Sequence, residues 1–306
     1  MAFSIAFLTG CDSLGHGEPP WDTDIPAGED FHASVGRWNS DGSKVLFLHT
    51  GPCSDSNLPC QNQLWVADLD TDSRSRIFLG PVLDPAWSPQ GKEIVFHSNS
   101  IPTFLFKIDI GADTLSPLTG PGSTNPDAEW HMIGRWSPDG SEILSTIYAG
   151  EPRGVSIMNS DGSRQQIIVP FGIHADWFPS GSKIVYVNWD MTAAVPRQRQ
   201  IYTANTDGTN RRKLTDLADS YILSTPAVSP DGSQIAFVYR GAEGEPELYL
   251  MNSSGENIRQ VTGIGGGVAP AWHPDGHSIL FTQYPERRLY LLDVRSLEVE
   301  PLFPQE

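Results

Sequence analysis

The segment WSPDG at residues 136–140 decides the fold, because close copies of it return along the chain. Proline suits the second position of a tight turn, Asp tolerates the third and Gly relieves the fourth, so each copy reverses the chain between two strands. The other copies are WNSDG at 38–42, WSPQG at 87–91, WFPSG at 177–181, VSPDG at 228–232 and WHPDG at 272–276. Their first residues lie 41 to 51 residues apart, a period that favours a four-stranded blade over a pair of helices. The sequence therefore predicts a propeller of six blades.

Each repeat contains the material for four strands. A β-rich apolar run follows every turn, at residues 44–47, 93–96, 142–144, 183–186, 234–237 and 278–281. A third strand ends in Asp or Asn in every repeat, at residues 64–68, 105–109, 155–159, 201–205, 248–252 and 289–293. Turn residues and a short outer strand come next. We interpret the Asn-x-Asp-Gly segments at 159–162 and 205–208 as such turns, because they lack the distal Glu of a calcium loop.

This unit resembles the repeat of the TolB-like six-bladed β-propellers of bacterial envelope proteins, in the order turn, apolar strand, LYLMN at 248–252 and closing Val-Thr at 261–262. The resemblance covers roughly residues 31–303, the propeller part only. It implies an all-β fold with four-stranded antiparallel blades, and contacts with other envelope proteins. The departures fall in single turns: Gln90 and Ser180 replace Asp, Asn39 and Ser40 replace Ser-Pro, and Val228 replaces Trp.

Composition and motifs narrow the function. The net charge of −17 repels phosphate backbones, and the one compact basic cluster, at 211–213, falls in a predicted outer hairpin. We therefore expect no nucleic-acid partner. The sequence contains no G-x-S-x-G, H-E-x-x-H, phosphate-loop or G-x-G-x-x-G motif. We expect a non-catalytic module of the bacterial cell envelope that binds an envelope protein or peptide, or another ligand. We also expect a monomer.

The first residues predict a membrane tether. Residues 1–11 are apolar, too short to span a bilayer, and end in LTGC, which resembles the lipobox of bacterial lipoproteins. We interpret them as a truncated lipoprotein signal remnant with lipidation at Cys11, followed by a flexible linker at 12–30 and the propeller at 31–306. The alternative is that residues 3–8 form a strand or a tail and that Cys11 is an ordinary thiol.

Two further cysteines point to the same compartment. Cys53 and Cys60 bracket a short loop, and their spacing matches neither a redox pair nor half of a zinc site. We expect a disulfide between them, with two free thiols as the alternative. Together with the lipobox, this pair predicts an exported protein, periplasmic or at the cell surface, that meets the membrane only through a lipid anchor.

Polar residues a few places before each repeat's Trp are expected to converge on the mouth of the central channel. The candidates for ligand binding there are His32, Asp84, His131, His174 and Asp176. We expect no cofactor, and polar side chains that line a water-filled channel. The alternatives are a divalent metal on His32, His131 and His174 that assists a polysaccharide lyase or hydrolase, and sugar binding without turnover. The three histidines lie six, five and three residues before their Trp, so they need not meet.

The sequence leaves the closure of the ring open. If each repeat supplies all four strands of one blade, the first and last blades meet through side chains alone. If the blades straddle the repeats, residues 3–8 supply a strand of the last blade.

Overall fold

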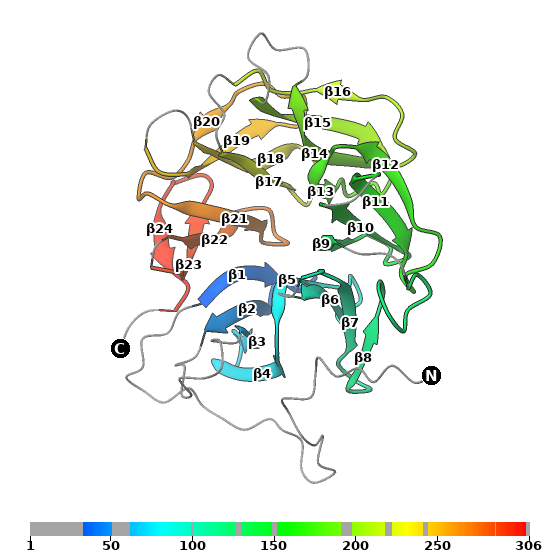
Figure 1. The fold of residues 1–306 in the computed structure, drawn as a ribbon. Helices are drawn as coiled ribbons and strands as arrows, with labels where there is room; N and C mark the ends of the chain where they lie inside the picture. Colours follow the sequence, from blue (N-terminus) through cyan, green and yellow to red (C-terminus); the bar gives the residue numbers. More distant parts are fainter. Residues whose placement is uncertain are drawn as a thin grey trace.

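The computed structural model describes residues 33–50, 62–98, 101–126, 130–148, 152–190, 198–217, 222–240, 244–284 and 286–303. These residues form six four-stranded antiparallel sheets that stand around a common centre in chain order (Figure 1). The prediction of a six-bladed all-β propeller is confirmed. Among the described residues, no helix has the length and apolar character needed to span a membrane.

Each blade takes its four strands from one repeat, with the first strand innermost. Blade one comprises β1 (Ala33–Trp38), β2 (Lys44–Thr50), β3 (Asn62–Asp68) and β4 (Ser73–Leu79). Blade two comprises β5 (Val82–Trp87), β6 (Glu93–Ser98), β7 (Leu105–Asp109) and β8 (Thr114–Pro117). Blade three comprises β9 (His131–Trp136), β10 (Glu142–Ile147), β11 (Gly154–Asn159) and β12 (Gln166–Pro170). Blade four comprises β13 (Ile173–Trp177), β14 (Lys183–Asp190), β15 (Gln198–Asn205) and β16 (Arg212–Lys213). Blade five comprises β17 (Ile222–Val228), β18 (Gln234–Arg240), β19 (Glu247–Asn252) and β20 (Arg259–Gln260). Blade six comprises β21 (Gly267–Trp272), β22 (Ser278–Gln283), β23 (Arg288–Asp293) and β24 (Val299–Pro301).

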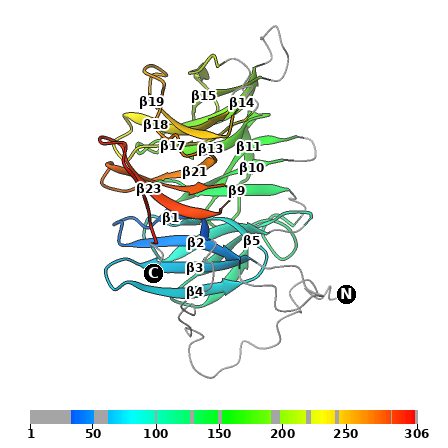
Figure 2. The same cartoon turned by 90° about the vertical axis from the view of Figure 1, so that its left-hand side faces the viewer.

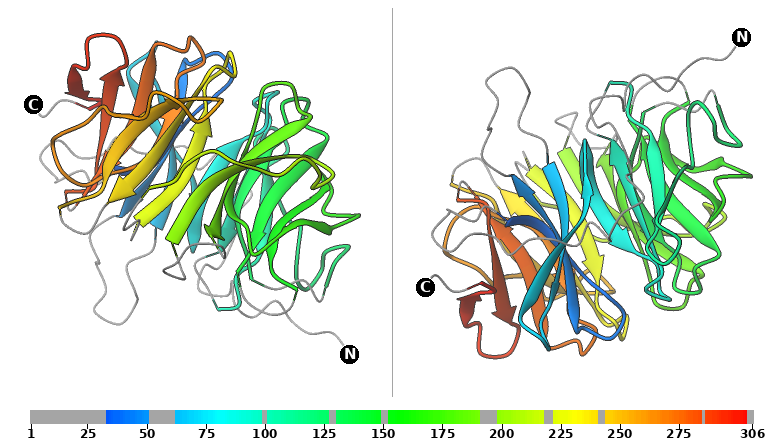
Figure 3. Two further views of the ribbon diagram at one scale, coloured as in Figure 1. Left: turned by 90° about the horizontal axis from the view of Figure 1, so that it is seen from above. Right: turned by 90° about the horizontal axis from the view of Figure 1, so that it is seen from below.

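The ring closes without exchange of a strand in the described residues. The first blade, blue, and the last, orange to red, lie side by side (Figures 2 and 3). The N–H of Val35 in β1 donates to Oγ1 of Thr282 in β22 at 2.9 Å. A Cβ on Gly36 would lie only 2.4 Å from Leu280, so glycine permits the close approach of β1 to the last blade. Packing and this hydrogen bond join the ends of the ring.

The junction between the first and last blades gives a stability prediction. Thr282 is fully buried, and Thr282→Val keeps its shape but leaves the Val35 N–H without an acceptor. We expect a loss of about 1–3 kcal/mol of unfolding free energy in urea titration, with faster amide exchange in β1. Thr146→Val, which removes the acceptor of the His174 N–H at the junction of blades three and four, is the matched control and should leave exchange in β1 unchanged. Unchanged exchange in the Thr282 variant would contradict a role in closure.

The second strand of each blade is a middle strand of its sheet, and most of its side chains are apolar; in blade one they pack on the neighbouring blade at either face. In β2, Val45 and Leu46 are fully buried, which explains the continuous apolar runs in the sequence. Five blades stack an aromatic of the second strand on one of the third, with ring centroids 5.7–6.5 Å apart: Phe47–Trp65, Phe96–Phe106, Tyr186–Tyr202, Phe237–Tyr249 and Phe281–Tyr290. Blade three has Ser145 opposite Ser156 at the corresponding place.

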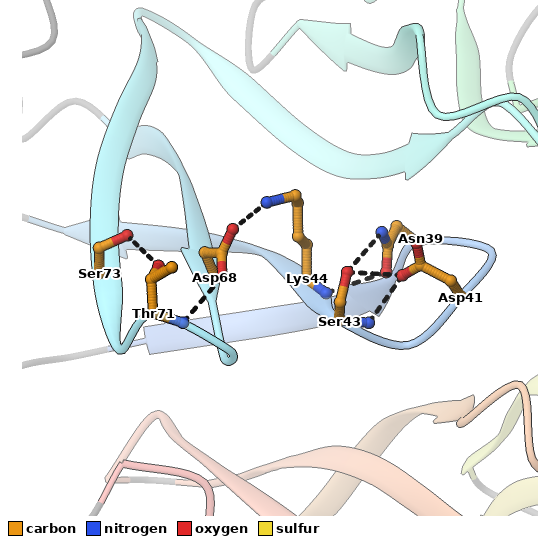
Figure 4. A network of polar contacts seen from close by, with 7 residues as sticks. All are labelled: Asn39, Asp41, Ser43, Lys44, Asp68, Thr71 and Ser73. Carbon is orange, nitrogen blue, oxygen red and sulfur yellow. Dashed lines mark hydrogen bonds and ion pairs between the residues drawn. The ribbon is translucent and has the colours of Figure 1, made fainter.

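The repeated turn is held by its own side chains, as the first blade shows (Figure 4). Oδ1 of Asp41 accepts the N–H of Ser43 at 2.9 Å and its hydroxyl at 2.6 Å. Oδ1 of Asn39 accepts the N–H of Lys44, as the serine hydroxyl of the usual phrase does in blades two, three and five. Lys44 also pairs with Asp68 across the strands. The substitution of Asn39 for serine therefore preserves the turn.

Two of the tryptophans that end an inner strand, Trp177 and Trp272, connect neighbouring blades by a hydrogen bond. Nε1 of Trp177 donates to the carbonyl of Arg135, and Nε1 of Trp272 to that of Ala227, both at 3.0 Å and both in the preceding blade. Val228 has no indole, and there the backbone N–H of Val228 donates to Oδ2 of Asp176 in blade four at 3.0 Å. Where valine replaces tryptophan, a backbone-to-carboxylate hydrogen bond therefore links blades four and five in place of the indole.

Every inner strand carries a β-bulge three residues before the end of the strand. The register shifts there in all six blades. The bulged residues adopt left-handed φ values of 46° to 58°: Val35, Asp84, Ile133, His174, Thr225 and Ala269. Such values are unusual for branched side chains, and bulges re-aim the residues beside them. This feature sets the orientation of the residues around the channel.

Candidate functional site

A cavity of about 370 Å³ lies on the turn face, the face formed by the turns that follow the inner strands. Four tryptophans line it, namely Trp38, Trp87, Trp136 and Trp272. The turns contribute Ser40, Pro89, Pro230 and Pro274. We call these eight residues the rim. The tight turns of the repeat therefore bring apolar and aromatic side chains from several blades together around one opening.

The inner strands line the rest of the cavity, and they contribute four polar or charged side chains beside apolar ones such as Ile133 and Ala271. Arg37, Arg135 and Asp176 each come one residue before the end of an inner strand, and His174 lies at the bulge of β13. We call these four residues the floor. Each backbone is fixed by its ladder, so the four side chains stand on rigid elements.

Opposite charges balance within this part of the channel. Burial would raise the pKa of the Asp84 carboxyl, but the electrostatic influence of His97 and of the two arginines outweighs it and lowers that pKa. Burial, together with the like charge of Arg135, lowers the pKa of Arg37 to about 9, and Asp84 and Asp176 limit the shift. At neutral pH, Arg37 is therefore still a cation.

Asp176 and His174 differ in their partners. Burial raises the pKa of Asp176, while Arg135 and the N–H of Val228 oppose the rise. Burial lowers the pKa of His174 to about 4, with Asp84 opposing, so the ring is neutral at pH 7. Its Nδ1 then accepts the N–H of Thr225 at 3.3 Å. The histidine thus bridges the bulges of blades four and five.

His131 lies inside blade three rather than on the cavity. Its Nδ1 is 2.8 Å from Oγ of Ser145, which is 2.7 Å from Oγ of Ser156. Its Nε2 is 2.9 Å from Nε2 of Gln165, and Oε1 of Gln165 accepts a hydrogen bond from the side-chain amide of Asn125. The ring is 1% exposed, and burial lowers its pKa to about 4. This network occupies the space that the stacked aromatic pair fills in the other five blades.

The structure separates the predicted site residues. His174 and Asp176 line the cavity, Asp84 lies at the bulge of β5 and is coupled by charge to the floor arginines, and His131 bonds within its own blade. His32 lies outside the described residues, as do Cys11, Cys53 and Cys60, so lipidation and the disulfide stay predictions. The roles of the five predicted site residues in ligand binding also stay predictions.

The sequence interpretation missed the two arginines. Arg37 and Arg135 hold the same place in blades one and three, where blades two, five and six have alanine. An alignment of the six repeats on their turns would have singled out this position, since a charge there departs from the small residue of the other blades. The sequence places the four tryptophans only at strand ends and in packing between blades, because the opening that they share arises when the ring closes.

Metal binding was the alternative for the channel. In the part of the chain that the structure describes, no three His, Cys, Asp or Glu side chains gather as a metal would need. Both ring nitrogens of His131 have polar neighbours in blade three, so His131 and the floor residue His174 do not share a site. A divalent metal therefore stays an untested alternative.

Comparisons with known proteins agree with the architecture. A family model described as the TolB beta propeller domain matches residues 149–300. The chain is a TolB-like β-propeller. The Tol-Pal system protein TolB of Alcanivorax borkumensis is 36% identical over 104 residues, which are 33% of this chain and 23% of that protein. A TolB homolog of Chlorobaculum tepidum is 28% identical over 172 residues, or 56% of this chain and 36% of that protein. The TolB-like chain thus spans about a quarter to a third of these curated relatives.

Solved structures show the same fold. TolB from Acinetobacter baumannii superposes on this TolB-like propeller with a TM-score of 0.69 at 18% identity, over 88% of this chain and 66% of that one. An oligogalacturonate lyase in complex with manganese superposes with a TM-score of 0.58 at 16% identity, over 89% and 78%. Likeness at such identities shows the fold alone, and the fold hosts both enzymes and non-enzymes.

Proposed function

We propose that this TolB-like propeller is a binding module of the bacterial cell envelope that takes a segment of a partner protein into the cavity on its turn face. The observation that carries the proposal is the cavity itself, apolar at the rim and charged at the floor. Its volume falls within the range of about 300–1,000 Å³ that is usual for ligand sites.

The side chains that line the cavity suit the binding of a protein segment. Tryptophan and proline side chains offer rigid apolar surface at low entropic cost, and the floor adds charged groups for orientation. Both sets stand on strand ends and tight turns of a closed ring, so little is lost in ordering them when a segment binds.

The compartment and partners follow from the relatives. One of them is named a Tol-Pal system protein, and we propose that this chain likewise acts with envelope proteins, in the periplasm or at the cell surface. A lipid on Cys11 would tether it, and the intact mass of the exported protein decides that point. We propose that the protein is a monomer. An oligosaccharide is the alternative ligand. No observation in the described residues specifically favours the metal-assisted lyase or hydrolase.

Site-specific photocrosslinking in cells tests the proposal. A photoreactive phenylalanine at Ser40, an exposed rim residue, should crosslink to one segment of an envelope protein, because its side chain faces the opening. The same residue at Ser180, an exposed serine of the matching turn in blade four that does not line the cavity, is the control. Ser40→Trp should then block binding of the identified partner, and Ser180→Trp should not. Equal crosslinking from both positions would contradict the cavity as the site.

A further inference from the structure

The two floor arginines have more hydrogen-bond donors than acceptors around them. Nη1 of Arg37 donates to the carbonyls of Gly36 at 2.9 Å and Ala269 at 3.2 Å. Nη1 of Arg135 donates to the carbonyl of Gly134 at 2.8 Å. No other hydrogen bond joins either guanidinium to the described residues. A guanidinium carries five N–H donors, so each keeps several for a ligand.

The carboxylates of the channel do not use these donors. Asp176 accepts the N–H of Val228 at 3.0 Å, and no ion pair joins Arg37 or Arg135 to an acidic side chain in the described ranges. Arginine forks match the two oxygens of a carboxylate, and such bonds are the strong ones in proteins. The two floor arginines, in the blades on either side of blade two, therefore line one cavity as cations with vacant hydrogen-bond donors.

The surroundings of the rim have the opposite charge. An exposed carboxylate directly follows three rim residues: Asp41 after Ser40, Asp231 after Pro230 and Asp275 after Pro274. Hydrogen bonds from Ser43 lower the pKa of Asp41, and bonds from Ser229 and Ser233 lower that of Asp231 to about 2. These groups are anions at neutral pH. With a net charge of −17, the chain repels a free anion before it reaches the floor.

We propose, building on the proposed function, that the cavity recognises an acidic residue of the partner segment, whose carboxylate binds between Arg37 and Arg135 while flanking lysines or arginines face Asp41, Asp231 and Asp275. The positive flanks offset the repulsion at the rim, and the carboxylate uses the vacant donors of the floor. A peptide can carry both charges a few residues apart. An oligouronate carries the carboxylate without the cations, so the charge pattern favours the peptide.

Defined peptides test this proposal on the purified full chain. The probe is the capped pentapeptide Lys-Gly-Glu-Gly-Lys, and its counterpart has Gln in place of Glu; binding is measured by calorimetry at low and physiological salt. We expect the Glu peptide to bind about tenfold more tightly than the Gln peptide, and this preference to vanish in Arg37→Gln and Arg135→Gln. Arg295→Gln, which removes an exposed arginine on the same face away from the cavity, is the matched control and should keep it. Asp231→Asn should weaken both peptides alike.

Conservative variants and a sugar keep the test decisive. Arg37→Lys and Arg135→Lys retain the charge but lose the fork, so the preference for Glu should shrink in a chain whose melting curve is unchanged. Equal binding of the two peptides, no binding of either, or a preference that survives both Gln variants overturns the proposal. Tighter binding of trigalacturonate than of the Glu peptide overturns the assignment to a peptide.

The outcome also separates this inference from the proposed function. A partner that crosslinks at Ser40 but binds Arg37→Gln as well as the wild type would leave the proposed function standing and refute the carboxylate site. If the Glu peptide binds through Arg37 and Arg135 but the chain crosslinks to nothing at Ser40, the carboxylate site stands and the proposed function is refuted.

Discussion

Between pH 6.5 and pH 5 the free energy of unfolding should fall by about 1.5 kcal/mol on account of His131 alone. The unfolded chain binds a proton on this histidine below its ordinary pKa of 6.5, whereas burial lowers the pKa in the folded chain to about 4. In this window the unfolded state therefore binds more protons, and stability falls as pH falls. His174, whose pKa burial also lowers to about 4, adds a loss of the same sign.

Urea titrations at half-unit steps of pH measure this loss. His131→Gln removes the titrating ring, and its stability should fall less steeply with acid, by about 1.4 kcal/mol per pH unit, than that of the wild type. Ser145→Ala is the control, because it removes the hydrogen bond to Nδ1 but keeps the ring; its stability should be lower throughout, with a steep pH dependence. A wild-type slope in His131→Gln would mean that the ring is protonated in the folded chain.

Gly208→Ala should cost about 2–4 kcal/mol of unfolding free energy. The φ of Gly208 is +78°, and a Cβ there would lie 2.2 Å from the carbonyl oxygen of Ile168 in the preceding blade. Left-handed strain contributes about 1 kcal/mol, and overlap with a backbone atom adds about 1–3 kcal/mol because the backbone cannot rotate away. Gly162 and Gly255 contact the preceding blade in the same way.

Gly91→Ala separates the two contributions. Gly91 has a φ of +67°, and nothing lies within 4 Å of a Cβ placed on it, so this variant measures the backbone strain without the contact. We expect a loss of about 1 kcal/mol in the same urea titration. Equal losses in the two variants would show that blade three yields to the added methyl, and that the contact does not hold the blades at a defined distance.

Much of the fold could be predicted from local patterns. Tight-turn residues such as those at 136–140 act within a few positions, and the apolar runs after them need only be buried on both faces. The bulges could not be predicted, because their residues share no type: Val35, Asp84 and His174 occupy the same place in different blades. The position is set by the inner strand bending around the channel, a property of the ring.

Blade three shows a signal that the repeats contain but that local interpretation misses. Alignment on the turns places Ser145 where the other blades have an aromatic second-strand residue, and its partner Ser156 departs in the same way. A pair of small polar residues in a core leaves space and hydrogen-bonding capacity, which a third polar side chain can fill. That this side chain is His131, five residues before its Trp, was visible only in the structure.

The sequence by itself determined the six blades, their four strands and the turns that join them, because those depend on contacts between residues near in the chain. Only the tertiary structure decided which residues share the channel. Arg37 and Arg135 are 98 positions apart in the chain and line one cavity, while His131 and His174, which the sequence grouped together, lie in different surroundings. The physical reason is that a side chain's place around a channel depends on ring closure and on the bulge beneath it, and both arise from packing between blades.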